Sequence, residues 1–208
     1  MSIGFDIADV FTEIGTQFNI KAASGEADVT GGYLDFEMNR QVTKPFIREV
    51  FLECFFAYDT PVEAGNVIEF QDGTGRRFMV MNKTQENFEN EAILYEGVLY
   101  KCNVSGELSR PSGEVFDSNY RQTTAWESIR TEAFALLSDR LFGTDLEQDE
   151  PIGQFNIESQ LLYLPHSYGV QQLDRYSPRS GEYYKVEIIA TRRFDQVDVC
   201  YLAEDTRP

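Results

Sequence analysis

His166 is the only histidine among the 208 residues of the chain, so any serine–histidine–acid triad would have to use it. The sequence contains no Gly-x-Ser-x-Gly motif, the turn that presents a serine nucleophile at the start of a helix. A hydrolytic triad is therefore not predicted. Replacing His166 with alanine should leave the biological activity of the folded protein intact.

The three cysteines, Cys54, Cys102 and Cys200, are an odd number at wide spacing, and no Cys-x-x-Cys pair exists. This pattern argues against a structural zinc site and against a disulfide framework. Lys101 lies beside Cys102 and could lower the pKa of its thiol. Because no histidine lies nearby in sequence, we expect buried, reduced strand cysteines instead.

Two further patterns fall short of a ligand site. The run Gly73-Thr74-Gly75 lacks the Lys-Ser/Thr of a phosphate-binding loop. The acidic run 145–151 lacks the spacing of an EF-hand, so a solvated loop is expected there rather than a calcium site. Nothing singles out a glycosidase-like pair among the 35 acidic residues. We therefore predict no catalytic residues, no cofactor and no metal, and a protein that is not an enzyme.

The net charge is −17, which would repel nucleic-acid phosphates and anionic membrane faces. Sequence-specific nucleic-acid binding and membrane binding are therefore not expected. A hydrophobic content of 42% is ample for a core, and the 16 phenylalanines and 11 tyrosines favour strands. The first residues include no basic targeting region, and no apolar run is long enough to span a bilayer. We expect a protein that is made in a cytoplasm.

An internal repeat organises the rest of the chain. Residues 67–95 align without a gap onto residues 173–201, at a constant offset of 106 positions. Such self-similarity predicts that one β-unit is built twice, although two unrelated hairpins with a common strand pattern remain the alternative. The matched pairs are Gly75 and Gly181, Phe78 and Tyr184, Val80 and Val186, Phe88 and Phe194, Glu89 and Asp195, Ile93 and Val199, and Tyr95 and Tyr201.

Each copy has alternating apolar residues after a glycine, which is typical of a strand that follows a turn. We expect Gly75 and Gly181 to lie in turns with positive φ. Phe78 and Val80 should be buried as Tyr184 and Val186 are, and Phe88 should match Phe194. Truncating Phe78 or Phe88 to alanine would then cost about 3–5 kcal/mol, whereas Arg76→Ala should hardly affect folding.

The remaining elements complete a mainly β fold. Apolar spacing predicts a short helix at 7–15, and strands are expected at 17–22, 33–38, 47–58 and 97–104, although 47–58 could also be helical. The polar stretch 105–124 predicts a long loop. A second helix is expected in the 124–142 region, from the spacing of Trp126, Ile129, Ala133, Leu136, Leu137 and Leu141.

These elements predict a β-barrel or β-sandwich-like fold with a short N-terminal helix. The chain would form a single mainly β domain, 1–208. Alternatively, it would contain two related β-units at about 60–104 and 160–204, joined by the loop and helix of 105–159.

The segment from Thr60 to Arg110 resembles neck proteins of tailed bacteriophages and prophages. The similarity lies in the runs 65–68, 77–84 and 96–103, and the second unit, which ends with 202–207, follows the same theme of a glycine turn and Tyr-x-Val. Head-to-tail connector and head-closure proteins of these phages are often small β-barrels. The commonest head-closure proteins have one barrel and about half this length, so adaptor, stopper, tail terminator and other virion positions stay open.

The resemblance implies a virion structural protein, assembled in the host cytoplasm, that forms a ring (hexamer or dodecamer) between the portal or head and the tail. Its partners would be a portal or adaptor protein and a tail protein, and genomic DNA could pass through its channel. The alternative is a carbohydrate- or ligand-binding module of a tail or receptor-binding apparatus. Trp126 and the tyrosines motivate it, because aromatic rings stack on sugars, although the same rings could fill the core.

Overall fold

The computed structural model describes residues 3–22, 28–37, 50–116, 118–138 and 160–207. The chain divides into two compact units. The first comprises Met1–Cys102 with Phe194–Val197, and the second comprises Asn103–Arg193 with Asp198–Pro208. The acidic run 145–151 lies outside the described residues.

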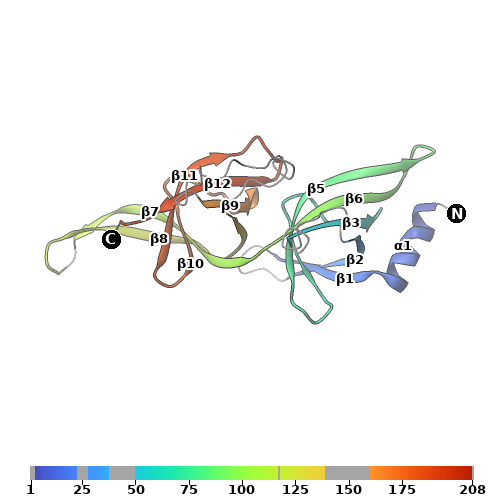
Figure 1. Cartoon of the computed structure of the whole chain (residues 1–208), viewed down its shortest axis with the longest axis horizontal. Coiled ribbons are helices and arrows are strands. Elements are labelled where there is room, and N and C mark those ends of the chain that lie inside the picture. The colour runs from blue at the N-terminus through green and yellow to red at the C-terminus, as the bar shows by residue number, and fades with distance from the viewer. Residues whose placement is uncertain (1–2, 23–27, 38–49, 117, 139–159, 208) are drawn as a thin grey trace, which may run out of the picture. The chain divides into compact units, whose positions relative to one another are not determined.

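The first unit is a helix followed by a closed six-stranded barrel with the order β1-β2-β3-β6-β5-β4 (Figure 1). Its elements are α1 (Ile3–Ile14), β1 (Thr16–Ile20), β2 (Val29–Glu37), β3 (Phe51–Ala57), β4 (Val67–Phe70), β5 (Arg77–Phe88) and β6 (Glu91–Lys101). The expected N-terminal helix is confirmed as α1, and β3 settles the choice between strand and helix within 47–58 in favour of a strand.

The second unit is a closed barrel with the order β10-β11-β12-β9-β8-β7. Its elements are β7 (Val104–Phe116), β8 (Gln122–Ser138), β9 (Gln160–Pro165), the short 3₁₀ helix η1 (His166–Tyr168), β10 (Arg175–Arg179), β11 (Glu182–Ala190) and β12 (Val197–Glu204). If the strand numbers of the first barrel are raised by six, its order becomes that of the second barrel. The mainly β fold is confirmed, and one topology occurs twice.

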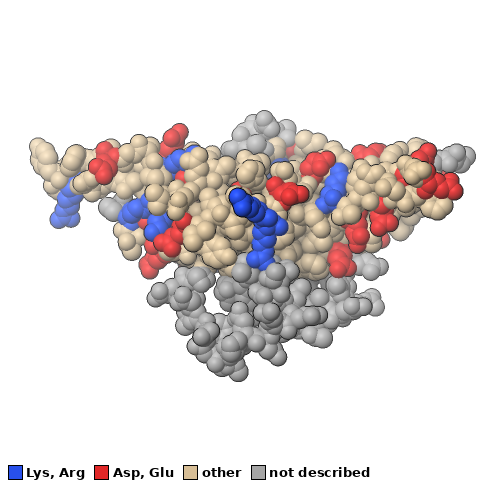
Figure 2. Space-filling view, turned by 90° about the horizontal axis from the view of Figure 1, so that it is seen from above, with Lys and Arg blue, Asp and Glu red and all other residues tan. Residues whose placement is uncertain are grey.

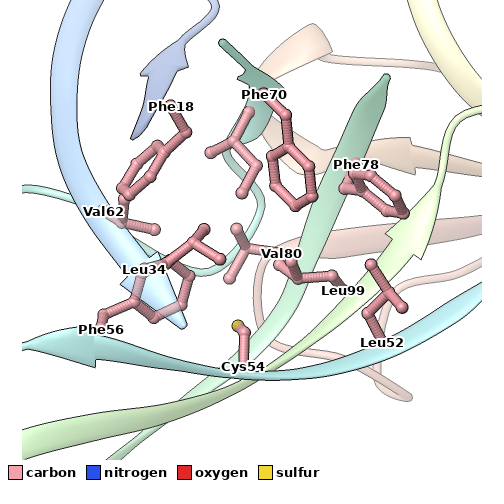
Figure 3. Packing of buried hydrophobic residues seen from close by; sticks show 11 residues of the cluster. Phe18, Leu34, Leu52, Cys54, Phe56, Val62, Phe70, Phe78, Val80 and Leu99 are labelled. Atoms are coloured by element: carbon pink, nitrogen blue, oxygen red, sulfur yellow. The ribbon is translucent and has the colours of Figure 1, made fainter. Parts of the chain in front are cut away.

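Every strand contributes to the interior of its own barrel. In the first barrel the buried side chains point toward one another from all six strands, as Figure 3 shows for Phe18, Phe56 and Phe78. In the second barrel the cluster likewise draws on all six strands, from Leu108 on β7 to Leu202 on β12. Six-stranded barrels are narrow enough to be filled by their own side chains, so both interiors are packed cores rather than channels.

The middle strands, β5 and β11, match at the offset found in the sequence. Val80 pairs with Leu99 of β6, and Val186 pairs with Leu202 of β12. A bulge follows directly in both, between Val80 and Asn82 and between Val186 and Ile188. Because a bulge fixes register and bends a strand, its recurrence at the same position shows that the strands are built alike.

The flanking strands match at other offsets. Val67 pairs with Met79 on β5, and Arg175 pairs with Lys185 on β11, so Arg175, and not Leu173, is the counterpart of Val67. Likewise the counterpart of Leu99 is Leu202. Relative to the offset of 106, the true correspondence is therefore shifted by two residues in β4 and β10. It is shifted by three residues in β6 and β12. Insertions at turns leave the pairing of strands intact, which explains the displacement.

The loops that lead into β4 and β10 match bond for bond. The Glu63 amide donates to the side chain of Asn66 at 2.9 Å, and the Gln171 amide donates to the side chain of Asp174 at 2.7 Å. The return bonds also recur, from the Asn66 amide to the Glu63 carbonyl at 3.1 Å and from the Asp174 amide to the Gln171 carbonyl at 3.2 Å. This agreement extends the repeat upstream of the segment detected in sequence.

Two expectations for the middle of the chain were wrong. Residues 105–124 are not a long loop, because β7 and the start of β8 occupy most of them. The described part of 124–142 is strand β8, not a helix. Register shifts in the β7–β8 pairing place extra residues on β8 around Ile129 and Thr131, which stretches the alternation of apolar residues until it resembles helical spacing.

Expectations for single residues had mixed outcomes. Gly75 and Gly181 both have positive φ, at 63° and 90°, as expected. Phe78 is buried, while its counterpart Tyr184 is half-buried against the second core. Phe88 does not match Phe194, because Phe88 ends β5 and is 49% exposed, whereas Phe194 lies between β11 and β12.

Candidate interaction surface

His166 lies in η1 with its Nδ1 3.0 Å from a carboxylate oxygen of Asp198, which is buried on β12. The counterpart of His166 in the first barrel is Tyr58, just after β3, so the repeated fold does not require an imidazole here. The contact joins the short helix after β9 to β12 within the second unit.

The thiols of Cys54 and Cys200 lie in the two barrel cores, as expected for buried strand cysteines. Burial raises the pKa of both thiols well above its usual range. Cys102 departs from this expectation, because it is half-buried and lies just after the end of β6. Burial also raises the pKa of its thiol, to about 12, so the neighbouring Lys101 does not activate it. Since the thiolate is the reactive form, none of the three is suited to nucleophilic chemistry at neutral pH.

The turn 72–76 satisfies its own polar groups. The Asp72 carboxylate accepts hydrogen bonds from the Thr74 amide at 2.9 Å and from the Arg76 guanidinium at 2.5 Å. Hydrogen bonds from Thr74 and Arg76 lower the pKa of Asp72 to about 2. The turn is thus occupied by an internal carboxylate where a phosphate loop would present free amides.

Among the described residues, no group of three or more His, Cys, Asp or Glu side chains could hold a metal ion. No helix in the same ranges is both long and apolar enough to cross a membrane.

A long ribbon extends from the second barrel. β7 pairs with β8 from Val104 to Phe116, but β10 pairs with β7 only at residues 107–109, and β9 pairs with β8 only at residues 136–138. Residues 110–116 and 118–128 therefore form a two-stranded arm beyond the barrel wall (Figure 1). Within the arm, the described parts of β7 and β8 pair only with each other. The barrel core therefore does not stabilise the outer half of the arm.

Buried ionic contacts fix the base of this arm. The Arg110 guanidinium donates from Nε and Nη2 to the two oxygens of the Asp174 carboxylate, each at 2.9 Å, and from Nη2 also to the Gly169 carbonyl at 2.9 Å. Asp174 is only 1% exposed. A bidentate arginine–carboxylate pair constrains direction as well as distance, so the arm leaves the barrel at a defined angle.

The tip of the arm exposes large hydrophobic side chains among polar ones. Phe116 is 69% exposed and Tyr120 is 90% exposed, and Val115 beside them is 48% exposed. Tyr120 also has a left-handed backbone, with φ at 58°, which is uncommon for an aromatic residue. Because exposed large rings are typical of contact surfaces, the tip of the arm is a candidate contact surface.

The first unit has its own extended hairpin, between β5 and β6. Its turn contains Glu89 and Asn90, both with positive φ, as a tight two-residue hairpin turn requires. Phe88 is exposed there among carboxylates. Figure 2 shows acidic side chains gathered toward the end of the view where this hairpin and α1 lie.

Helix α1 packs on β2, β3 and β6 of the first unit and buries Phe11. Ile3, Phe5, Val10 and Ile14 flank this packed face and are between 45% and 72% exposed, while Asp6, Asp9 and Glu13 form the opposite side. The apolar stripe of the helix is thus wider than the part that its own unit covers. The helix is therefore a second candidate contact surface.

Trp126, the residue that motivated the sugar-binding alternative, lies on β8 near the base of the arm. The guanidinium carbon of Arg175 lies 3.6 Å from its ring centroid, and that of Arg207 lies 4.8 Å away. The ring is thus engaged by arginines of its own chain and is not an open platform for stacking a sugar.

Comparisons with known proteins find no family model, no curated protein and no solved structure that matches this chain.

Proposed function

We propose that the chain is a structural subunit of the neck of a tailed bacteriophage, joining the head or portal to the tail. The observation that carries the proposal is the aromatic tip of the β7–β8 arm, at Phe116 and Tyr120. The small closed barrels agree with the resemblance of residues 60–110 to phage neck proteins, which are often small β-barrels. The exposed side of α1 adds a second contact surface on the other unit.

The energetics favour an assembled state. Burying a side chain such as Phe116 at an interface contributes about 1.5–3 kcal/mol, and Tyr120 contributes a similar aromatic area. These two residues lie on one arm, far along the ribbon from the barrel core. Contact between an arm of one copy and a different surface of the next is a head-to-tail arrangement, and such contacts close into a ring when the rotation permits.

The charge of the chain suits this role. With a net charge of −17, a ring of these subunits would surround packaged DNA without adhering to it. The partners in this proposal are further copies of the chain in a hexamer or dodecamer, a portal or adaptor protein, and a tail protein. Each chain supplies two barrels, so even a hexamer would present twelve of them.

The arm is tested by replacing Phe116 and Tyr120 together with serine. The double variant should melt at the same temperature as the parent, because neither aromatic side chain belongs to a barrel core. It should nevertheless fail to enter subunit rings or phage particles, because both side chains contribute to the interface. Glu114→Ser is the matched control, since it changes an exposed residue of the same arm without removing a ring. If the double variant assembles as the parent does, the arm is not the assembly contact and the proposal loses its main support.

A further inference from the structure

A polar pocket lies on the outer wall of the second barrel. It has a volume of about 540 Å³ and is bordered by β7, β8, β10, β11 and the loop after β10. Its charged and aromatic lining residues are Glu107, Trp126, Arg175, Arg179 and Tyr183. Six hydroxyl side chains also line it: Ser105, Ser109, Ser128, Thr131, Ser177 and Ser180. Pockets of this size accommodate small molecules.

Arg175 is held rigidly at the floor of this pocket. Its Nε donates to a carboxylate oxygen of Asp205 at 2.7 Å, and its guanidinium carbon lies 3.6 Å from the Trp126 ring centroid and 4.8 Å from that of Tyr183. Arg207 also donates to both oxygens of the Asp205 carboxylate, each at 2.8 Å. Two guanidinium groups thus share one buried carboxylate, which leaves the cluster with an excess positive charge.

The described lining of the pocket holds one donor that is buried without a partner and one that is exposed at its mouth. The indole Nε1 of Trp126 is buried and has no hydrogen-bond partner among the described residues. A buried donor without a partner is costly unless something binds it. Arg179 is exposed at the mouth of the pocket, and the described contacts include no ion pair for its guanidinium.

On the equivalent wall of the first barrel, the basic side chains are paired with a carboxylate of the same wall. There Glu69 accepts from Arg77 at 2.8 Å and lies 3.6 Å from the Lys21 ammonium. The pairings that define the repeat place Ser109, Ser177 and Tyr183 at the positions of Lys21, Glu69 and Arg77, and place Arg175 at that of Val67. The second barrel thus has a serine in place of Glu69 and gains the guanidinium of Arg175, while Glu107, which pairs with Ser177, replaces Asn19.

We propose that this pocket binds a small hydroxylated carboxylate, namely an acidic monosaccharide of the uronate class. The guanidinium of Arg179 and the indole N–H of Trp126 bind the carboxylate, because charge-assisted hydrogen bonds are the strong ones. The serine and threonine hydroxyls and Glu107 bind the sugar hydroxyls, and the ring of Tyr183 covers an apolar face of the sugar. The site stands independently of the neck assignment and would remain if that assignment failed.

Trp126 is the only tryptophan in the chain, so its fluorescence reports on this pocket directly. The purified full-length protein is titrated with glucuronate, glucose and acetate at matched ionic strength. Glucuronate should change the fluorescence saturably, while glucose and acetate at equal concentration should not. If glucose is equivalent to glucuronate, or if glucuronate produces no saturable change, the proposal is wrong. If acetate binds as tightly as glucuronate, the site recognises a carboxylate alone and the sugar assignment is overturned.

Two variants locate the site. Arg179→Ala should weaken glucuronate binding by about tenfold or more, because it removes a charge-assisted bond. Ser177→Glu restores the carboxylate of the first barrel and should abolish binding by repulsion. Arg76→Ala, which removes a half-buried arginine of the first unit, should leave the affinity unchanged. Melting curves identify any variant that fails to fold, in which case Ser177→Asp replaces Ser177→Glu. Glucuronate binding that is indifferent to both Arg179→Ala and the acidic variant at position 177 contradicts the proposed site.

Discussion

Leu173 occupies, in the second barrel, the left-handed backbone position that Gly65 occupies in the first. The φ angles are 74° and 83°. The Gly65 amide donates to the Val80 carbonyl at 2.7 Å, and the Leu173 amide donates to the carbonyl of its counterpart, Val186, at 2.8 Å. A side chain with a Cβ is strained in this region, whereas glycine is not. The second barrel therefore carries strain that the first avoids.

Replacing Leu173 with glycine should relieve this strain. Compared with Leu173→Ala, which keeps a Cβ but removes most of the half-exposed side chain, Leu173→Gly should be more stable by about 1 kcal/mol. Urea denaturation of the two variants measures the difference. A glycine variant that is less stable than the alanine variant would show that the backbone at this position is not strained.

The two phenylalanines of β5 should behave very differently. Phe78 is 1% exposed in the first core, so Phe78→Ala should cost about 3–5 kcal/mol. Phe88 is 49% exposed at the end of the same strand, so Phe88→Ala should change the stability by less than about 0.5 kcal/mol. Thermal or denaturant unfolding measures both. Equal costs would contradict the extended hairpin and would restore the expectation drawn from sequence alone.

Asp205 makes stability depend on pH in the acid range. Burial would raise its pKa, but hydrogen bonds from Arg207 and Arg175 outweigh burial and hold the pKa below its ordinary value. A carboxyl group with a lowered folded-state pKa stabilises the protein above its unfolded pKa, about 3.9, and loses that contribution as the pH falls through the folded value. The protein should therefore lose stability progressively below about pH 4.

Asp205→Asn is the matched test of this pH dependence. The variant should be less stable than the parent at pH 7, because the two arginines lose their shared carboxylate. Below about pH 4 the difference between the two proteins should shrink, because the parent carboxylate is then being protonated. Denaturant unfolding at several pH values measures it, and a difference that stays constant down to pH 2 would assign the effect to packing alone.

The cysteines should be protected in the folded protein. Cys54 and Cys200 lie in different barrel cores, and burial raises the pKa of each thiol. A thiol reagent at neutral pH should modify them slowly in the native state and rapidly in denaturant. Mass spectrometry of the modified peptides assigns the rates to each cysteine. Rapid native labelling of either core cysteine would mean that its barrel opens readily.

Part of the fold could be predicted from the sequence because β5 and β11 share an unbroken pattern. No insertion separates Gly75 from Val80, or Gly181 from Val186, so the single offset of 106 residues aligns both pairs. The first half of each barrel could not be aligned in this way, because large and small core residues lie on different strands in the two barrels. Register places Gly106 where the first barrel has Phe18, and places Tyr176 where it has Ile68.

This exchange fits the space available in the second barrel. A Cβ on Gly106 would lie 2.8 Å from the ring of Tyr176, so a large residue on one strand requires a small one on its neighbour. The β8 strand was missed for another reason, since its bulges disturb the period on which strand prediction relies. The aromatic arm and the arginine pocket depend on pairing between distant segments, which no local pattern in the sequence reveals.

Electron microscopy tests the central claim most directly, applied to the purified protein alone and together with portal and tail components. A neck subunit should appear as a closed ring with a central channel, either alone or seated on those components. The Phe116 and Tyr120 double serine variant should be absent from such rings. A protein that remains monomeric under all these conditions, and joins neither portal nor tail, would contradict the account.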